Sequence, residues 1–392
     1  MTYASLTTRL ADLGGAKWEI HARARALKSA GREVIELTIG EPDVATPPDL
    51  MDAACAAMRQ GRTGYSNGQG EPELLTALAV RYSTRRGRYI GTDQVMCFPG
   101  TQTTLYAVMM ALVQAGDEVL VGDPMYATYE GVIVATAATM VPVPLRPEHG
   151  FRMQAADVAA KITPRTRVLF LNSPHNPTGA VLTPADLAAL GALAVQHDLW
   201  IVADEVYEDL VFPGVNFASP LSDPALADRV IIASSISKSH ASPGFRSGWC
   251  VGPAAFIQRL LPLSETMLFG NQPFIADMTT LAVSTPSAVA PGMVSRFSAR
   301  AALLHRLMDG VAGLRVNQPQ AGMFGLVDVR ATGLSGVDFA NGLLDAQGVA
   351  VMPGESFGGG LAGWLRLSLT QSDDLVAEAC ARITAHAVSV GG

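Results

Sequence analysis

The chain has 392 residues, with 28 basic and 35 acidic side chains, a net charge of −7 and a hydrophobic content of 49%. This length predicts two domains, or one large and one small, with enough apolar material for a buried core. The acidic balance and the lack of any Lys/Arg-rich run argue against a nucleic-acid partner, because phosphate neutralisation needs clustered positive charge.

The chain also lacks signals for export or membrane insertion. Its N-terminal sequence, MTYASLTTRLADLGG, has no apolar region of the secretory type, and no stretch approaches the roughly 18 consecutive apolar residues that span a bilayer. Cys55, Cys97, Cys250 and Cys380 are widely spaced and form no CxxC pair. Such spacing is typical of a reducing cytosol and predicts neither disulfides nor structural zinc. We therefore expect a cytoplasmic protein without a metal site.

Short apolar runs alternate with helical patterns from Gln94 onward. The predicted strands are 94–98, 118–122, 167–172, 199–205 and 229–235. The predicted helices are 103–116, 126–137 and 183–198. This alternation predicts an α/β fold with a largely parallel sheet covered by helices on both faces. A ligand is then expected beyond the carboxyl ends of the strands.

The pattern changes at about Pro286. Longer helical segments follow at 294–313, 337–348 and 372–388, interleaved with apolar runs at 322–329, 349–354 and 364–369. We interpret this part as a smaller α+β domain. The predicted division is a large domain over residues 47–285 and a small domain formed by residues 1–46 and 286–392.

The clearest chemical signal is the segment SSISKSHASPGFRSGW, residues 234–249, which follows an apolar strand. Lys238, one of only four lysines in the chain, lies among serines here, and Arg246 follows a Pro-Gly turn. The hydroxyls of Ser235 and Ser237 and the guanidinium of Arg246 suit a phosphate dianion, and a partly desolvated Lys238 suits a carbonyl nucleophile. The alternative is an ordinary polar loop.

Two other predicted strands end in polar side chains. The run LWIVADE ends at Asp204, with Tyr207 three residues later, so that both side chains are able to face the crevice at the strand ends. The alternative is a surface turn with a packed aromatic residue. In FLNSPHNPTG, Asn176 lies in an Asn-Pro turn that presents an amide, although such turns are usually structural.

Three further signals are weaker. Gly100 and Thr101 precede an apolar-periodic helix, where free N–H groups and the helix dipole make an anion site. Tyr126 follows the next strand end and is placed either flat against a ring or in helix packing. Arg366 alternates with apolar neighbours in WLRLSL, and an inward arginine of this kind needs a carboxylate from the protein or from a substrate.

Together these segments resemble the class I and II aminotransferases, which are pyridoxal-phosphate enzymes of fold type I. The PHNPTG turn, the D-x-x-Y strand end and the S-x-S-K followed by P-G-x-R occur in the order of that family, and the resemblance covers essentially the whole chain. It implies a seven-stranded sheet and a pyridoxal 5'-phosphate cofactor. Within the family, AKWEIHARA, SPHNPTGA and SISKSHA resemble the bacterial arginine:pyruvate aminotransferases.

The resemblance also implies a role for each motif residue around the ring. Lys238 bonds to the cofactor aldehyde and then moves a proton at the substrate Cα, which requires a neutral amine and hence a lowered pKa. Asp204 keeps the pyridine nitrogen protonated. Asn176 and Tyr207 bond to the phenolic oxygen, and Tyr126 stacks on the ring.

The remaining implied roles concern the phosphate and the substrate. The groups expected at the phosphate are Ser235, Ser237, Arg246, Gly100, Thr101 and Gln102, together with Tyr65 from a second subunit, which implies a homodimer with a shared active site. Arg366 and Asn176 bind the substrate carboxylate, and Gly40 lets the chain approach the substrate closely. Trp18 either covers the substrate as part of an N-terminal lid or packs in the core or an interface.

The activity that follows is ping-pong exchange of an amino group between an L-amino acid and a 2-oxo acid such as pyruvate or 2-oxoglutarate. The donor is expected to be arginine or a large neutral or aromatic amino acid. No second arginine suited to a dicarboxylate side chain stands out, which makes an aspartate preference doubtful. Glu41, Asp43, Glu130 and Glu355 are the acidic residues nearest the motifs in sequence.

Alternatives of other classes remain open. The same lysine and aspartate would serve a C–S lyase, a racemase or an amino acid oxidase. A cofactor-binding regulator would need a DNA-binding module, for which the sequence leaves no room ahead of the aminotransferase-like part. A nicotinamide-binding protein would need G-x-G-x-x-G after the first strand, and that motif is missing.

Overall fold

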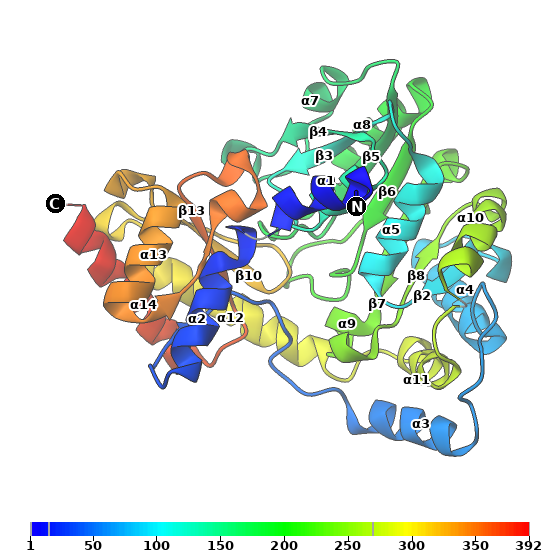
Figure 1. The fold of residues 1–392 in the computed structure, drawn as a ribbon, viewed down its shortest axis with the longest axis horizontal. Coiled ribbons are helices and arrows are strands. Elements are labelled where there is room, and N and C mark those ends of the chain that lie inside the picture. Colours follow the sequence, from blue (N-terminus) through cyan, green and yellow to red (C-terminus); the bar gives the residue numbers. More distant parts are fainter. Residues whose placement is uncertain (1, 15, 269, 392) are drawn as a thin grey trace.

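A seven-stranded sheet is the largest element of the protein, which we describe from a computed structural model covering residues 2–14, 16–268 and 270–391 (Figure 1). Its strand order is β2-β8-β7-β6-β5-β3-β4. The strands are β2 (Val95–Phe98), β3 (Glu118–Asp123), β4 (Thr139–Pro144), β5 (Thr166–Asn172), β6 (Trp200–Asp204), β7 (Val230–Ser235) and β8 (Gly248–Val251). Strand β8 runs antiparallel to both neighbours, and the other pairs are parallel. The predicted α/β fold with a mostly parallel sheet is confirmed.

Successive residues of each strand enter two different apolar cores. Met96, Val168 and Val202 belong to one core, and their neighbours Cys97 and Leu169 belong to the other. This follows from the pleat of a strand, which sends alternate side chains to opposite faces. Because both faces are buried, the strands read as continuous apolar runs in the sequence.

Helices cover both faces of this sheet. Helices α5, α6 and α10 contribute to one core, and α4 and α8 contribute to the other, while α11 packs against α3 and α4. The bounds are α3 (Pro48–Arg59), α4 (Pro72–Arg86), α5 (Thr101–Leu112), α6 (Tyr129–Ala135), α7 (Ala155–Ala159), α8 (Pro184–Gln196), α9 (Ile236–Ser239), α10 (Ala254–Met267) and α11 (Pro273–Ser284). Within the described ranges, no helix combines the length and the apolar character needed to cross a membrane.

Local sequence accounts for the helix boundaries. The Oγ1 of Thr183 accepts from the N–H of Asp186, whose carboxylate accepts from the N–H of Thr183, and this capping box starts α8 with Pro184 at its first position. The predicted helix over 126–137 begins later than expected, at Tyr129. Tyr126 therefore lies in the preceding turn.

The C-terminal part forms separate, smaller sheets. Strands β12 (Met352–Pro353), β13 (Trp364–Ser368), β10 (Phe324–Asp328) and β9 (Arg315–Asn317) make an antiparallel sheet in that order, while β1 (Ile35–Glu36) pairs in parallel with β11 (Val349–Ala350). The flanking helices are α2 (Glu19–Ser29), α12 (Ala290–Met308), α13 (Gly336–Gln347) and α14 (Asp373–Val390). The run 349–354, expected as one strand, divides between the two sheets. The domain boundaries at residues 47 and 285 stay a prediction.

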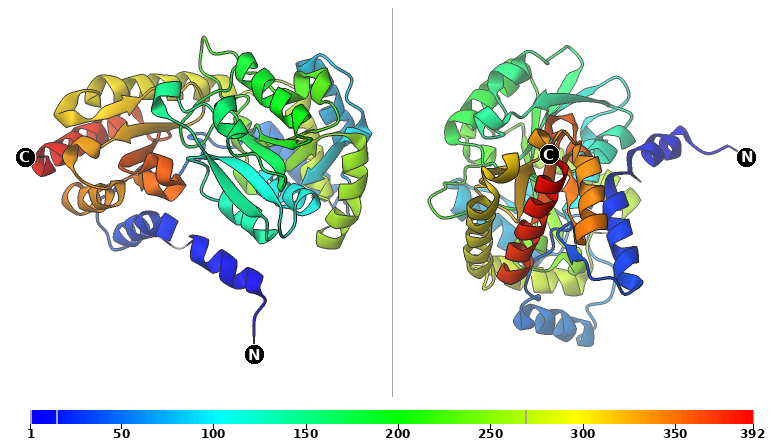
Figure 2. Two further views of the ribbon diagram at one scale, coloured as in Figure 1. Left: turned by 90° about the horizontal axis from the view of Figure 1, so that it is seen from above. Right: turned by 90° about the vertical axis from the view of Figure 1, so that its left-hand side faces the viewer.

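The N-terminal segment lies along the outside of the molecule. Figure 2 shows α1 (Ser5–Gly14) and α2 as two successive helices on the surface. Helix α1 contacts α6 of the large sheet, and the short 3-10 helix η1 (Ala16–Trp18) contacts another, η9 (Gly354–Phe357). The segment thus links the helices around the large sheet to the C-terminal part.

Candidate active site

The predicted site residues come together at one edge of the large sheet. Asp204 ends β6 and pairs with Asn172, the last residue of β5, and with Ala233 of the neighbouring strand β7. Strand β7 ends at Ser235, just before the short helix that carries Lys238. Because the carboxyl ends of parallel strands meet at one edge, the loops that follow them converge there.

A cavity of about 220 Å³ lies at this edge. Its lining includes the predicted residues Trp18, Gly40, Thr101, Gln102, Tyr126, Asn176, Asp204, Tyr207, Ser235, Ser237, Lys238, Arg246 and Arg366. The lining also contains residues that the sequence did not single out, namely Ile39, Leu105, Tyr129, Val206, Pro243 and Phe324. Sequence motifs thus found the polar part of the cavity and missed most of its apolar wall.

Lys238 presents a half-buried amine to this cavity. Nζ of Lys238 donates a 2.7 Å hydrogen bond to the backbone carbonyl of Gly40. Burial lowers the pKa of Lys238 to about 8, and the positive charges of Arg366 and Arg246 lower it further against the opposing charges of Glu41 and Asp204. A neutral amine is the form that attacks a carbonyl or takes a proton. Lys238 is thus suited to nucleophilic and base chemistry near neutral pH.

Asp204 is a buried carboxylate held by two hydrogen bonds. Its Oδ2 accepts from the hydroxyl of Tyr129 at 2.7 Å, and its Oδ1 accepts from the N–H of Val206 at 3.1 Å. Burial raises the pKa of Asp204 to about 6, while the two hydrogen bonds and the charge of Lys238 oppose that rise. A buried acid of this kind favours a cationic partner. Tyr129 was not predicted, although it follows Tyr126 by three residues at the start of α6.

A cradle for an anion lies between β2 and α5. Gly100 has φ +86°, which favours glycine, and a Cβ at this position would lie 2.2 Å from Nη2 of Arg246, so that guanidinium would have to shift. Thr101 begins α5, where free N–H groups point outward, and its buried Oγ1 has no hydrogen-bond partner among the described residues. Ser235 and Ser237 add hydroxyls to the same cavity. This donor set fits the phosphate of pyridoxal phosphate.

Arg366 is a fully buried cation, 2% exposed, on β13. Its guanidinium lies between the rings of Phe324, at 4.0 Å, and Phe357, at 4.4 Å. Nη2 donates to the carbonyl of Thr38 at 2.6 Å and Nη1 donates to Oδ1 of Asn176 at 3.3 Å. Burial lowers the pKa of Arg366 to about 10, which still leaves it charged at neutral pH. None of the carboxylates in the described ranges pairs with it, so its charge is available to a ligand.

Several predicted residues complete the wall. Burial raises the pKa of Tyr126 and that of Tyr207, so both hydroxyls stay protonated and act as donors. The backbone at Gly40 is so close to Phe324 that a Cβ would lie 2.1 Å from the ring. Gln102 accepts a 2.9 Å hydrogen bond from the hydroxyl of Thr128 through Oε1.

Tyr65 lies elsewhere, in the loop between α3 and α4, and is 93% exposed. It is not among the residues that line the cavity of its own chain. This placement is the one expected of a residue that serves a second subunit, but that role stays a prediction.

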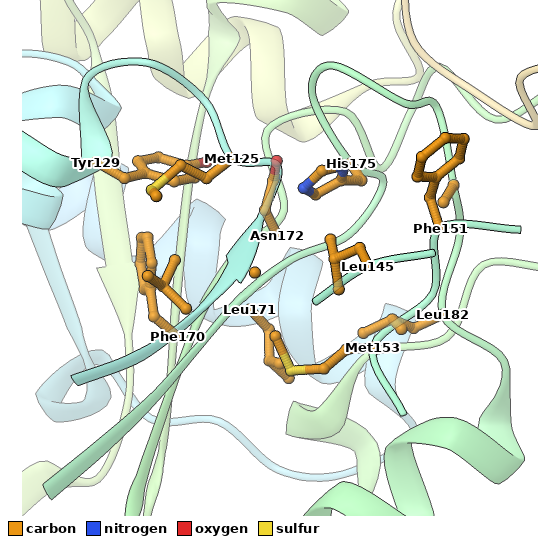
Figure 3. A pocket seen from close by; sticks show the side chains of 13 residues that line it. Met125, Tyr129, Leu145, Phe151, Met153, Phe170, Leu171, Asn172, His175 and Leu182 are labelled. Carbon is orange, nitrogen blue, oxygen red and sulfur yellow. The ribbon is translucent and has the colours of Figure 1, made fainter. Parts of the chain in front are cut away.

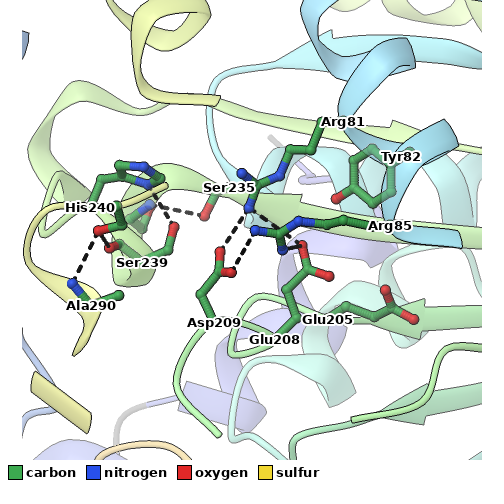
Figure 4. Close-up of polar contacts among 12 residues, drawn as sticks. Arg81, Tyr82, Arg85, Glu205, Glu208, Asp209, Ser235, Ser239, His240 and Ala290 are labelled. Atoms are coloured by element: carbon green, nitrogen blue, oxygen red, sulfur yellow. Dashed lines mark hydrogen bonds and ion pairs between the residues drawn. The ribbon is translucent and has the colours of Figure 1, made fainter. Parts of the chain in front are cut away.

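A second layer of charges supports the turn after β6 (Figure 4). Glu205, Glu208 and Asp209 on this turn face three arginines of α4. The closest pairs are Arg81–Asp209 and Arg85–Asp209, both at 2.8 Å, Arg86–Glu205 at 2.9 Å, Arg85–Glu208 at 3.0 Å and a shorter Arg86–Glu208 contact. Burial raises the pKa of Glu205, and the Arg86 charge opposes it. Asp204 and Tyr207 thus line the cavity, whereas the acidic side chains between and after them contact the arginines of α4.

A smaller, mostly apolar cavity of about 20 Å³ adjoins the site (Figure 3). Tyr129 lines both cavities and packs edge-on against Phe170, with ring centroids 4.6 Å apart. Burial lowers the pKa of His175 in this wall to about 4, so His175 is neutral. The space is about that of one water molecule. The residues around this space pack against the ring of Tyr129, and we assign no catalytic role to the cavity.

Comparison with known proteins agrees with this geometry. Residues 32–383 match the family model described as aminotransferase class I and II. The chain belongs to this family. The aminotransferase is 44% identical to the arginine–pyruvate transaminase AruH of Pseudomonas aeruginosa, and the match covers 100% of both chains.

Two further relatives show how wide the similarity is. The aminotransferase is 34% identical to an aspartate/prephenate aminotransferase of Cereibacter sphaeroides over 93% of each chain. Its structure superposes on the aspartate aminotransferase of Rhizobium meliloti with a TM-score of 0.93, 29% identity and 99% coverage of each chain. Relatives with different donors therefore share this fold. Like the family, this aminotransferase depends on pyridoxal phosphate.

Proposed function

We propose that this aminotransferase transfers the amino group of arginine, or of another large L-amino acid, to a 2-oxo acid such as pyruvate. One observation carries the proposal. A lysine with a lowered pKa, a buried aspartate and an arginine without a carboxylate partner among the described residues line one cavity, as Lys238, Asp204 and Arg366. Similarity to the arginine–pyruvate transaminase supports the choice of donor and acceptor.

The substrate carboxylate would bind to Arg366. A guanidinium binds a carboxylate through two parallel N–H donors, and burial between two aromatic rings keeps this one in a fixed plane. Asn176, which already contacts Nη1 of Arg366, would donate its amide to the same carboxylate. These contacts would orient the Cα of the substrate toward Lys238.

Bound pyridoxal phosphate supplies the aldehyde and the electron-withdrawing ring on which transamination depends. Lys238 would hold the aldehyde through Nζ and, once released, its neutral amine would move the proton at the substrate Cα. Asp204 would keep the ring nitrogen protonated, and Tyr129 holds Asp204 in place.

Other residues would fix the cofactor. Asn176 and Tyr207 would donate to the phenolic oxygen, while Tyr126 would pack on the ring. The residues proposed for the phosphate are Gly100, Thr101, Gln102, Ser235, Ser237 and Arg246.

We further propose a homodimer in which Tyr65 of one subunit reaches the phosphate site of the other. Its exposure and its position outside the cavity of its own chain support this arrangement. All four cysteines are free thiols, which supports a cytoplasmic location.

The test is spectroscopic. The purified protein, loaded with pyridoxal phosphate, should show a visible absorbance band that a donor amino acid bleaches and a 2-oxo acid restores. A panel of twenty amino acids should rank arginine among the fastest donors. Failure of every amino acid to bleach the band would contradict the proposal. Release of ammonia, pyruvate or peroxide without an added 2-oxo acid would instead indicate a lyase or an oxidase.

A further inference from the structure

The side chain of an arginine donor would bring a guanidinium cation into the site, and no carboxylate in the cavity wall is free to pair with this cation. Among the residues that line the cavity, Asp204 is the single carboxylate, and both its oxygens already accept hydrogen bonds. Its role at the ring nitrogen also excludes it from binding a substrate side chain. A carboxylate of this chain that pairs with the guanidinium would therefore lie outside this lining.

Two of the four acidic residues near the motifs are committed to the protein. Asp43 accepts 2.8 Å hydrogen bonds from the guanidinium groups of Arg296 and Arg300. Glu355 accepts 2.9 Å hydrogen bonds from the backbone N–H groups of Gly336 and Gly363 through Oε1. Oε2 of Glu355 has no hydrogen-bond partner among the described residues but is buried, so neither carboxylate is accessible to a ligand.

Glu41 faces a different space. It lines an adjoining polar cavity of about 480 Å³ whose wall also contains His21, Arg25 and Lys28. In that cavity His21 and Lys28 pair with Glu36, at 2.9 Å and 3.4 Å, rather than with Glu41. Glu41 is not among the residues that line the active-site cavity.

Glu130 differs from the other three in forming an ion pair with a single lysine, Lys17. Its Oε2 lies 2.5 Å from Nζ of Lys17, and the two side chains are 25% and 23% exposed. Nζ of Lys17 also contacts the carbonyl of Ala127 at 3.4 Å, in the turn between Tyr126 and Tyr129, both of which line the cavity. The ion pair therefore lies against the turn that forms one wall of the cavity.

We propose that Glu130 binds the cationic end of a basic amino-acid donor, and that Lys17 occupies this place when no donor is bound. The inference rests on the proposed function, since it identifies the side chain that the same site accepts. A guanidinium offers two parallel donors to a carboxylate, whereas Lys17 contacts a single oxygen of Glu130. The fork of an arginine donor would therefore displace the lysine.

Lys17 and the donor guanidinium would compete for Glu130, so removing the Lys17 side chain should strengthen donor binding. The ammonium of Lys17 also contacts the carbonyl of Ala127 at 3.4 Å, and the hydroxyl of Ser356 donates to the backbone carbonyl of Lys17 at 3.0 Å. The backbone contact keeps the segment in place when the side chain is removed. A Lys17→Ala variant should therefore free Glu130 without releasing Trp18 from the cavity.

The test compares arginine with citrulline, its neutral analogue, in single-turnover bleaching of the holoenzyme. In Glu130→Gln the second-order rate constant for bleaching by arginine should fall by about tenfold or more, as expected for the loss of a hydrogen-bonded charge pair. The value for citrulline should change less than about twofold. In Lys17→Ala the value for arginine should rise. Glu41→Gln is the matched control and should keep the wild-type ratio of arginine to citrulline.

A binding measurement removes catalysis from the comparison. 5-Guanidinopentanoate lacks the α-amino group and cannot react, and pentanoate lacks the guanidinium as well. Titration calorimetry with the holoenzyme should show that Glu130→Gln loses the preference for the guanidino compound and Lys17→Ala strengthens it. Equal loss of both ligands in Glu130→Gln would overturn the inference, and so would loss of the preference in Glu41→Gln.

The outcomes separate this inference from the proposed function. If the wild type transaminates neutral amino acids while neither variant alters the ratio of arginine to citrulline, the role of Glu130 is wrong and the aminotransferase activity stands. If no amino acid bleaches the wild type, both fail. A folding defect in Glu130→Gln would leave Lys17→Ala to decide, because an unchanged rate with arginine in that variant also overturns the inference.

Discussion

The hydroxyl of Tyr129 donates a 2.7 Å hydrogen bond to Oδ2 of Asp204, joining the first turn of α6 to the last residue of β6. Asp204 lies on the same face of its strand as Val202, which packs in the core under α5 and α6. Its position therefore follows from the strand pleat, and its ionisation depends on the residue that α6 places against it.

Removal of this hydroxyl should change the pH dependence of the reaction. Tyr129→Phe deletes a hydrogen bond to a buried carboxylate, which raises the pKa of Asp204 from its value of about 6. Such bonds are worth about 1.5–3 kcal/mol, so the acid limb of kcat/KM should move up by about one pH unit or more. The measurement is a pH profile for one amino acid.

Tyr82→Phe is the control for this prediction. Tyr82 is equally buried and its hydroxyl accepts a 2.9 Å hydrogen bond from Trp249, but it does not line the cavity. Its loss should cost stability and leave the acid limb in place. The same acid limb in wild type and Tyr129→Phe would show that Tyr129 only packs.

The lowered pKa of Lys238 should govern how fast the cofactor-free protein recovers its colour. Below pH 8 more of the amine is protonated and unable to attack an aldehyde, so the rate with pyridoxal phosphate should rise with pH and level off above about 8. An ordinary lysine would keep gaining until about pH 10.4. Stopped-flow absorbance over pH 6–10 measures this, and a rate still rising above pH 9 would contradict a lowered pKa.

Loss of Arg366 should affect substrate binding more than cofactor binding. Arg366→Ala removes a buried guanidinium that no described carboxylate neutralises, so the KM for amino acids should rise by about a hundredfold. Arg366→Lys keeps the charge without the two parallel donors and should recover part of the loss. Equilibrium dialysis of pyridoxal phosphate provides the second readout. A loss of cofactor affinity larger than the rise in KM would place Arg366 at the phosphate.

The charge cluster behind the active-site turn should contribute more to the free energy of unfolding than an exposed ion pair does. Arg86→Ala would leave Glu205 and Glu208 buried without their closest cation, at a cost of about 3–5 kcal/mol in the free energy of unfolding. Glu378→Ala, which breaks an exposed pair with Arg382, should cost under about 1 kcal/mol. Urea denaturation compares the two variants. Equal losses would mean that the cluster does not stabilise the turn.

The strands that could be predicted are those buried on both faces. The predicted strands 229–235 and 167–172 contain the unbroken apolar runs 230–233 and 168–171 and correspond to β7 and β5. Strand β4 gave no such signal because it contains Pro142 and Pro144, which the sheet tolerates at its edge. Strand β8 is short and follows a loop rather than a helix, so the alternating pattern did not include it.

The site divides in the same way. Asp204 ends a strand, Asn176 and Lys238 follow strand ends within recognisable motifs, and the structure brings all three to one cavity. Tyr129 and Phe324 lie in apolar surroundings, where a sequence does not distinguish a site residue from a core residue. The contacts of Glu130 with Lys17 join residues 113 positions apart, which no local pattern predicts.

The covalent attachment of the cofactor to Lys238 is the claim on which the account depends most. Borohydride reduction of the holoenzyme, followed by peptide mapping, tests it directly. We expect a single modified peptide that contains residue 238, and no colour or modification in Lys238→Ala. Modification of Lys17, Lys28 or Lys161 instead, or a protein that stays colourless with pyridoxal phosphate, would contradict the account.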